Sequence, residues 1–216
     1  MNAVLLVVRD AGQAANWHAE LSEAGRWKML PPARSFAEAR QAITRHQPAL
    51  LVSDLQLPDG VLADTVRGLR ASPPRQSHVR VLALTGNAPN NLLLDALQAG
   101  ADNMFETTQA APGTLARHVA ETLTGGANIA PWIAHHLMAH FDVQALEPKA
   151  QSVPTLVSPL SLTAEDRQLL RQLSSGHCLN ALATHAGVAA GELASQVGCI
   201  YRKMQWELRA GNLQLA

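Results

Sequence analysis

The sequence has little of what marks secreted, membrane-spanning or disulfide-stabilised proteins. Its 216 residues include only two cysteines, Cys178 and Cys199, which are far apart and fit neither a metal motif nor a disulfide framework. The strongly apolar run 4–8 ends at Arg9 and is too short for a secretory signal or a membrane helix. The net charge is zero, so no overall basic field attracts nucleic acid. These absences lead us to expect a cytoplasmic protein without a membrane partner.

Hydrophobic residues make up 47% of the sequence, which is enough to form the cores of one large or two small domains. Its central stretch is 49–60, where a short apolar run ends at Ser53 and Asp54 and is followed by turn residues. Such a run is typical of a strand buried on both faces of a parallel sheet. Asp54 would then lie at the carboxyl edge, where open α/β sheets bind ligands. The alternative is an Asp that only bonds to the following backbone.

The first 125 residues alternate short apolar runs with amphipathic helical patterns. The expected strands are 4–8, 27–30, 49–54, 79–84 and 102–106, and the expected helices are 11–25, 35–45, the segment marked by Leu62, Val66 and Leu69, 91–100 and 112–123. This alternation predicts an α/β fold with a doubly wound, five-stranded parallel sheet. Right-handed crossovers would bring Asp10, Asp54, Thr85 and Thr107 to one edge of that sheet.

Four motifs in residues 1–125 resemble the receiver domain of bacterial response regulators. They are 6–10 (LVVRD), 52–60 (VSDLQLPDG), 82–86 (LALTG) and 99–103 (AGADN), in the order and spacing of that family. The resemblance implies a flavodoxin-like fold and a phosphorelay role in which Asp54 accepts a phosphoryl group. It also implies a magnesium site, with Asp10, Asp54 and Gln56 as candidate ligands, and a hydroxyl at Thr85 that contacts the phosphate.

The chain departs from the family pattern where the chemistry would occur. Arg9 stands in place of one of the paired acids, and Thr107 stands where the family has a lysine. Magnesium is held mainly by carboxylate oxygens and water, and phosphoryl transfer relies on positive charge beside the phosphate. We therefore expect an atypical receiver in which magnesium is not required and binds weakly, and phosphorylation of Asp54 is absent or slow. We expect the Arg9 guanidinium to pair with Asp54; the alternatives are contact with a bound phosphate or exposure to solvent.

The rest of the chain is expected to comprise a linker at 126–160 with one helix at 132–141, and a helical unit at 161–216. Thr163 is the expected N-cap of the first helix in that unit, and further helices are expected at 179–185, 189–204 and 207–215. The core positions of this unit resemble the LuxR-type helix-turn-helix domain, which often follows a receiver and binds DNA as part of a dimer.

The helix at 189–204 is the expected recognition helix, and its outward positions are expected to be Glu192, Ala194 and Gln196. The candidate DNA contacts are Ser195, Gln196, Cys199, Arg202 and Lys203. Because the charges of this unit are nearly balanced and an acid faces the phosphates, we expect weak, strongly salt-sensitive binding to promoter DNA that dimerisation would rescue.

These observations favour a DNA-binding transcriptional response regulator with a degenerate phosphoacceptor site. We expect it to form a homodimer and to be controlled by dimerisation or by a protein partner, with a sensor kinase among the candidates. The alternative is an interaction module that does not bind DNA and modulates another regulator through its receiver. An enzyme is not expected and no catalytic residue is assigned, because no nucleophile–base pair, phosphate loop or metal cluster is visible.

Overall fold

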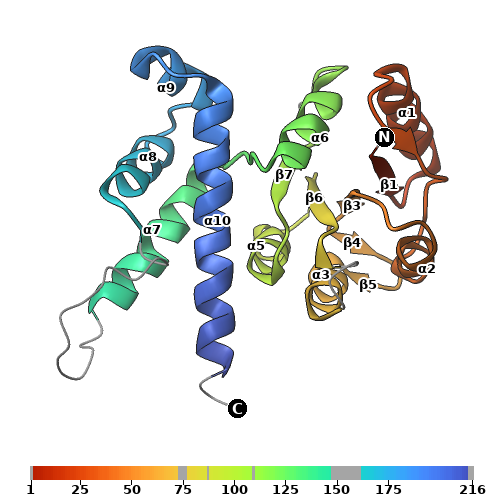
Figure 1. Ribbon diagram of the computed structural model, residues 1–216, viewed down its shortest axis with the longest axis horizontal. Coiled ribbons are helices and arrows are strands. Elements are labelled where there is room, and N and C mark those ends of the chain that lie inside the picture. The colour runs from red at the N-terminus through yellow and green to blue at the C-terminus, as the bar shows by residue number, and fades with distance from the viewer. Residues whose placement is uncertain (1, 73–76, 87, 109, 147–161, 214–216) are drawn as a thin grey trace. The chain divides into compact units, whose positions relative to one another are not determined.

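The computed structural model describes residues 2–72, 77–86, 88–108, 110–146 and 162–213. The chain divides into two compact units, Met1–Ala127 and Asn128–Ala216. The first unit is α/β and the second is helical (Figure 1). Within the described ranges, no helix combines the length and the apolar composition that a membrane span requires.

The first unit contains a five-stranded parallel sheet with the strand order β2-β1-β3-β6-β7, which confirms the predicted fold class. The strands are β1 (Ala3–Val7), β2 (Lys28–Met29), β3 (Leu50–Asp54), β6 (Arg80–Thr85) and β7 (Asn103–Glu106). The helices between them are α1 (Ala11–Glu23), α2 (Phe36–His46), α3 (Leu62–Ala71), α5 (Asn90–Ala99) and α6 (Thr114–Thr124).

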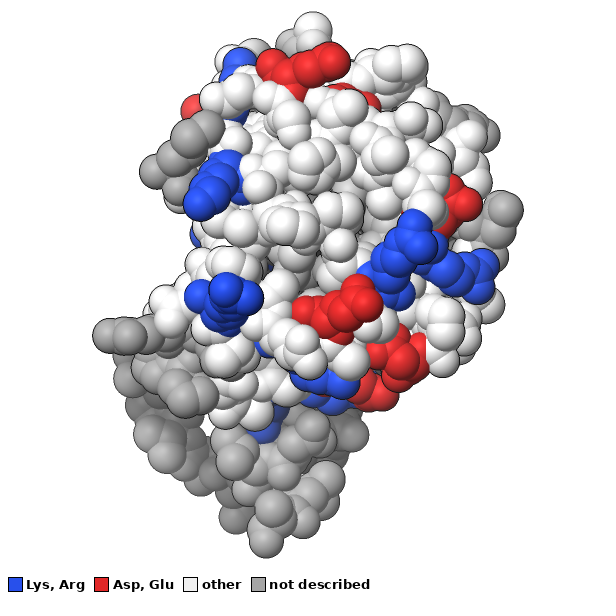
Figure 2. All heavy atoms as spheres, turned by 90° about the vertical axis from the view of Figure 1, so that its right-hand side faces the viewer, with Lys and Arg blue, Asp and Glu red and all other residues white. Residues whose placement is uncertain are grey.

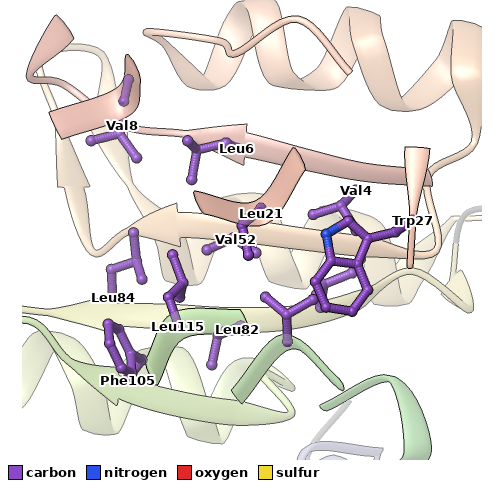
Figure 3. Packing of buried hydrophobic residues seen from close by; sticks show 13 residues of the cluster. Val4, Leu6, Val8, Leu21, Trp27, Val52, Leu82, Leu84, Phe105 and Leu115 are labelled. Atoms are coloured by element: carbon purple, nitrogen blue, oxygen red, sulfur yellow. The ribbon is translucent and has the colours of Figure 1, made fainter. Parts of the chain in front are cut away.

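Helices cover both faces of the sheet, with α1 and α6 on one face and α2, α3 and α5 on the other (Figure 1). Figure 3 shows the core under α1 and α6, where Val4, Leu6 and Val8 of one strand meet Leu21 and Leu115 of the two helices. Successive side chains of a strand point to opposite faces of the sheet. Leu5 and Val7, which are also fully buried, therefore pack on the face covered by α2, α3 and α5. The apolar run 4–8 is therefore explained by burial on both faces.

One short hairpin was not predicted. Strands β4 (Gln56–Leu57) and β5 (Gly60–Val61) pair antiparallel directly after β3. Pro58 and Asp59 form the turn between them, as these residue types indicate. The hairpin places the chain that follows Asp54 close to the beginning of α3.

A partly buried arginine, Arg70, connects several segments at the amino edge of the sheet. The guanidinium of Arg70 donates to the carbonyl oxygens of Ser77 (2.8 Å), Val79 (2.7 Å) and Gly100 (2.7 Å) and forms a 2.8 Å ion pair with Asp102. The same Asp102 carboxylate accepts the backbone N–H of Val81 at 2.8 Å. One cation thus joins the end of α3 to the starts of β6 and β7.

The helical unit consists of α7 (Pro131–Leu146), α8 (Ala164–Ser174), α9 (Leu179–Ala186) and α10 (Ala190–Leu213). The helix predicted within the linker is longer than expected and packs against α8 within this unit. Its buried residues Ile133, Leu137 and Phe141 form the predicted stripe. The remainder of the predicted linker, 147–160, lies outside the described residues.

The prediction of two separate helices at 189–204 and 207–215 is wrong, because α10 is one continuous helix (Figure 1). The two residues between the predicted helices, Gln205 and Trp206, include neither proline nor glycine, so nothing there interrupts the backbone hydrogen bonds. Gln205 is also buried, with 8% of its surface exposed. Packing of this turn against the unit therefore favours continuation of the helix.

Candidate functional site

The first candidate site lies at the carboxyl edge of the sheet, around Asp54. This residue ends β3, and its Oδ2 atom accepts the backbone N–H of Arg9 at 2.9 Å. Burial raises the pKa of the Asp54 carboxyl above its ordinary value, and the negative charge of Asp10 raises it further. The hydrogen bond from the Arg9 amide and the positive charge of the Arg9 guanidinium lower the same pKa and so offset part of the rise. Asp54 is therefore a half-buried carboxylate with one oxygen already hydrogen-bonded.

The expected ion pair between the Arg9 guanidinium and Asp54 is not found among the described residues, so this prediction is wrong. Register explains the difference. Val7 of β1 pairs with Ser53 of β3, so the backbone that follows β1 passes beside Asp54 and donates its own N–H. The Arg9 side chain is left exposed, where a guanidinium keeps its water and gains little from an ion pair.

Asp10, the acid that remains of the family's pair, caps a helix. Its Oδ1 atom accepts the backbone N–H of Gln13 at 2.7 Å, at the N-terminus of α1. The third candidate metal ligand, Gln56, is exposed on β4. No group of three potential His, Cys, Asp or Glu ligands occurs in the described part of the chain. Two carboxylates, each with one oxygen engaged, are a poor match to the oxygen-rich shell that magnesium requires.

Thr85 and Thr107, the two threonines of the site, are hydrogen-bonded to each other, and Thr85 is also bonded to Glu106. Thr85 ends β6, and its hydroxyl lies 3.2 Å from Glu106 Oε2 and 3.3 Å from the carbonyl oxygen of Phe105. The hydroxyl of Thr107 donates to the carbonyl oxygen of Thr85 at 3.0 Å. The other Glu106 oxygen accepts the hydroxyl of Thr108 at 2.7 Å. At the ends of β6 and β7 the polar groups thus bind one another, and no lysine is present there.

The second candidate site is the exposed face of α10, where five DNA contacts were predicted. Two of the five, Gln196 and Lys203, bind inward to Asp166 on α8. Gln196 Nε2 donates to Asp166 Oδ1 at 3.1 Å, and Lys203 Nζ donates to Asp166 Oδ2 at 2.6 Å. Asp166 also completes the predicted capping box with Thr163. These two side chains therefore fix α10 to α8, and their free donors are fewer than the sequence indicates.

The other three predicted contacts, Ser195, Cys199 and Arg202, are exposed. Arg202 contacts the Cys199 sulfur at 3.0 Å, and the Ser195 hydroxyl donates to the carbonyl oxygen of Gly191. The expectation that Ala194 points outward is wrong, because only 4% of its surface is exposed. Ala194 lies one helical turn before the buried Val197 and so belongs to the inner face.

Comparison with known proteins bears on both units. No family model matches the chain. The DNA-binding transcriptional activator DevR/DosR of Mycobacterium tuberculosis is 29% identical to it over 178 residues, which cover 82% of this chain and 76% of that protein. The match therefore extends over the receiver fold and into the helical unit.

Solved structures show the same arrangement of folds. The RcsB response regulator of Salmonella typhimurium matches over 94% of this chain and 91% of its own, with a TM-score of 0.51 and 14% identity. A LuxR-family response regulator from Aurantimonas sp. SI85-9A1 matches over 66% of this chain and 99% of its own, with a TM-score of 0.55 and 22% identity. The chain is thus similar to response regulators: its first unit has the fold of their receiver domains, and a helical unit follows it.

Several residues that shape the two candidate sites were missed by sequence reasoning. The Asp59 carboxylate accepts the backbone N–H groups of Phe36 (3.0 Å) and Ala37 (2.9 Å), which lowers its pKa and ties the hairpin after Asp54 to α2. Glu106 was missed although it ends the last strand beside two threonines, a position that could have signalled a hydrogen-bonded cluster. The bond from Lys203 to Asp166 joins two helices and has no local sequence signal.

The surface charge seen on one face of the protein fits its zero net charge. Figure 2 shows that face, on which acidic and basic side chains are intermixed and large areas are uncharged. No field of a single sign covers the described part of that face.

Proposed function

We propose that this chain is a response regulator that controls transcription by binding promoter DNA through its helical unit, and that phosphorylation of Asp54 is not its ordinary switch. Two features support the DNA-binding part. The similar protein DevR/DosR is named a DNA-binding transcriptional activator. Helices α9 and α10 are joined by a short turn at Gly187, whose φ of 69° requires the left-handed conformation that glycine adopts easily. Two helices joined in this way form a helix-turn-helix.

The proposal about the receiver rests on one observation: in the part of the chain that the structure describes, no cationic side chain contacts the carboxylate or hydroxyl groups of the Asp54 site. Thr107 stands at the lysine position and donates to Thr85, and Arg9 reaches Asp54 through its backbone alone. Phosphoryl transfer is accelerated by positive charge held against the phosphoryl oxygens. The Arg9 guanidinium is the nearest candidate, but it is exposed and hydrated. We therefore expect slow phosphorylation and a weak magnesium requirement.

A rebuilt site provides the test. The double variant Arg9→Asp/Thr107→Lys restores the acid pair and the lysine of the family pattern, whereas the natural chain retains neither. After incubation with acetyl phosphate and magnesium, intact-mass spectrometry should show a phosphoryl adduct on the double variant and little or none on the natural chain. Adding Asp54→Asn to the double variant should remove the adduct and so locate it. Stoichiometric phosphorylation of the natural chain would contradict the proposal.

A second candidate function is an interaction module that has lost DNA binding. The inward contacts of Gln196 and Lys203 favour it, because they reduce the donors available to bases and phosphates. Gel-shift titration against the region upstream of its own gene distinguishes the two functions. A DNA-binding regulator should form a complex at low salt that weakens in Arg202→Ala and not in Arg167→Ala, a matched exposed arginine on α8. Failure to bind any DNA at low salt would favour the interaction module.

A further inference from the structure

The first unit has a cavity between the end of α1 and the side of α6, which we name the Trp27 cavity. Its volume is about 510 Å³, which is within the range of sites that hold small molecules. Its apolar wall includes Ala24, Ala116 and Ala120, which pack against the core cluster that contains Trp27. Because these side chains are short, they leave room beside the indole.

Trp27 is the most deeply buried residue that the argument for this cavity uses. Only 6% of its surface is exposed, and its indole belongs to the core cluster in Figure 3. Among the described residues its Nε1 atom is buried without a hydrogen-bond partner. An indole N–H can only donate, and a buried one usually finds an acceptor. Folding has already withdrawn this N–H from water, so an acceptor on a ligand would add a bond without further desolvation of the indole.

The charged residues of the Trp27 cavity favour an anion. Arg26 and Arg117 line it and are exposed, and the Arg26 side chain has no ion pair within the described ranges. Arg117 Nη2 lies 3.5 Å from His118 Nε2. Burial and the Arg117 charge lower the pKa of His118 to about 4, so the two groups do not repel each other at neutral pH. Glu121 is an acid that lines the same cavity, which leaves an excess of one positive charge.

A second hollow beside the Trp27 cavity carries the opposite charge. Its volume is about 750 Å³, and Glu20, Glu23 and Trp17 line it. Glu20 Oε1 accepts the backbone N–H of Ala116 at 3.3 Å, so an acid already lies at the first turn of α6. The two hollows adjoin, because Ala116 lines both. The acids of the second hollow repel a carboxylate, and the arginines of the first attract it.

We propose that the Trp27 cavity binds a small carboxylate with an apolar body. One carboxylate oxygen accepts the Nε1–H of Trp27, and Arg26 and Arg117 supply the positive charge that balances the anion. The apolar body lies along the three alanines of the wall. Since these side chains are short, little has to move for the oxygen to reach the buried nitrogen.

Binding at the Trp27 cavity goes beyond the proposed function and does not depend on it. The cavity lies within the first unit, and its lining residues include neither Asp54 nor the threonines of the Asp54 site. Its use as a control of transcription, in contrast, rests on the proposed function. In a DNA-binding regulator, a carboxylate at this position would be a chemical input that needs no phosphoryl group.

Nuclear magnetic resonance of the full, isotope-labelled chain tests the site with phenylacetate as the probe. Each of the four tryptophans gives one indole N–H signal, and the signal missing from Trp27→Phe belongs to Trp27. Phenylacetate should move that signal downfield, as a new hydrogen bond does, and should saturate with a dissociation constant on the order of 1 mM. Phenylacetamide has a similar shape and no charge, so it should bind about fivefold more weakly.

Variants separate the donor from the charges. Trp27→Phe keeps an aromatic ring and removes the N–H, so it should weaken phenylacetate binding about tenfold, measured on the signals of the probe. Arg26→Gln/Arg117→Gln should weaken binding about fivefold, and both side chains are exposed, so the fold should be unaffected. The matched control is Arg45→Gln on α2, which covers the opposite face of the sheet, and it should have no effect.

A Trp27 signal that phenylacetate does not move would overturn the proposal, as would equal binding by the natural chain and Trp27→Phe. A shift that never saturates would show an adventitious contact and would also contradict it. Movement of the Trp17 signal alone would place the probe in the second hollow and refute the assignment. Asp54→Asn should bind phenylacetate like the natural chain. Failure of the natural chain to bind DNA would count against the proposed function and leave the result at the Trp27 cavity standing.

Discussion

The two edges of the receiver sheet hold their carboxylates in different ways. At the amino edge Asp102 forms a 2.8 Å ion pair with Arg70 and lies 3.6 Å from Arg80. At the carboxyl edge Asp54 accepts a backbone N–H and forms no ion pair among the described residues, while Glu106 accepts neutral hydroxyls. Two arginines thus contact a carboxylate at the amino edge, where three segments of the fold are joined. Among the described residues, no cationic side chain makes such a contact at the carboxyl edge, where a phosphoryl group would need positive charge.

The comparison suggests where charge matters for stability in this fold. The partly buried Arg70–Asp102 pair at the amino edge cannot be broken without leaving Asp102 only the longer contact with Arg80. The carboxylates at the carboxyl edge, Asp54 and Glu106, are half-buried and exposed, so we expect a change of charge there to cost little stability. The predictions below test this contrast, beginning with the largest expected effect.

Removal of the Arg70 guanidinium should have the largest effect. In Arg70→Ala the Asp102 carboxylate would lose its 2.8 Å partner and keep only the 3.6 Å contact with Arg80, and three carbonyl groups would lose a donor. The unfolding free energy of the first unit should therefore fall by about 2–3 kcal/mol. Arg67→Ala is the matched control on the same helix, because its ion pair with Asp64 is 58% and 72% exposed at the two side chains. Its loss should cost about 0.5 kcal/mol. Denaturant unfolding measures both, and equal effects would contradict the contrast.

The helical unit offers a second carboxylate held by a cation. Asp166→Asn should lower the stability of this unit by about 1–2 kcal/mol, because it weakens the capping box and the bond from Lys203. Chemical unfolding followed by the far-ultraviolet circular dichroism of the helices would measure the loss. The exposed Glu165→Gln, one residue earlier in the same helix turn, is the control and should change little.

The same carboxylate predicts a dependence on pH. Burial raises the pKa of Asp166, but the hydrogen bonds from Lys203, Gln196 and the Thr163 amide outweigh burial and leave the pKa below its ordinary value of 3.8. The stabilisation is therefore fully present above pH 3.8 and is lost as the pH falls through the lowered pKa. The unfolding free energies of the natural chain and Asp166→Asn should converge in acid. A difference that persists unchanged in acid would be the contrary result.

A smaller effect is expected at the carboxyl edge from Glu106. In Glu106→Gln the oxygens that receive the hydroxyls of Thr85 and Thr108 lose their charge, and the unfolding free energy should fall by about 0.5–1 kcal/mol. The side chain is exposed, so water replaces much of what is lost. Thermal unfolding of the variant would detect the shift. A loss as large as that of Arg70→Ala would mean that the two edges are held alike.

The smallest effect is expected from Arg9→Ala. Because Arg9 binds Asp54 through its backbone N–H, truncation of the side chain keeps that hydrogen bond. The unfolding free energy should change by less than about 0.5 kcal/mol. A loss above about 2 kcal/mol would show that the guanidinium pairs with Asp54 after all.

Much of this architecture could be predicted from sequence because local physical rules decide it. The run 4–8 and the stretch before Asp54 could only be buried strands, and Ser35, Thr163 and Gly187 mark the helix ends where the structure has them. The order of the receiver motifs gave the edge at which Asp10, Asp54, Thr85 and Thr107 lie.

The errors concern interactions that depend on register or on tertiary packing. Whether Arg9 reaches Asp54 by its side chain or its backbone depends on the pairing of β1 with β3, which no local pattern records. Packing of Gln205 decides that α10 continues. The inward turn of Lys203 depends on the position of Asp166 on another helix. Sequence reasoning placed the residues on elements and could not place their side chains.

The measurement that bears most directly on the proposal that phosphorylation is not the switch is the DNA affinity of the full chain with and without acetyl phosphate and magnesium. Fluorescence anisotropy on promoter DNA should give dissociation constants that agree within about twofold, and Asp54→Asn should give the same value under both conditions. An affinity that rises about tenfold or more with acetyl phosphate in the natural chain, and stays unchanged in Asp54→Asn, would contradict the proposal that phosphorylation of Asp54 is not the switch.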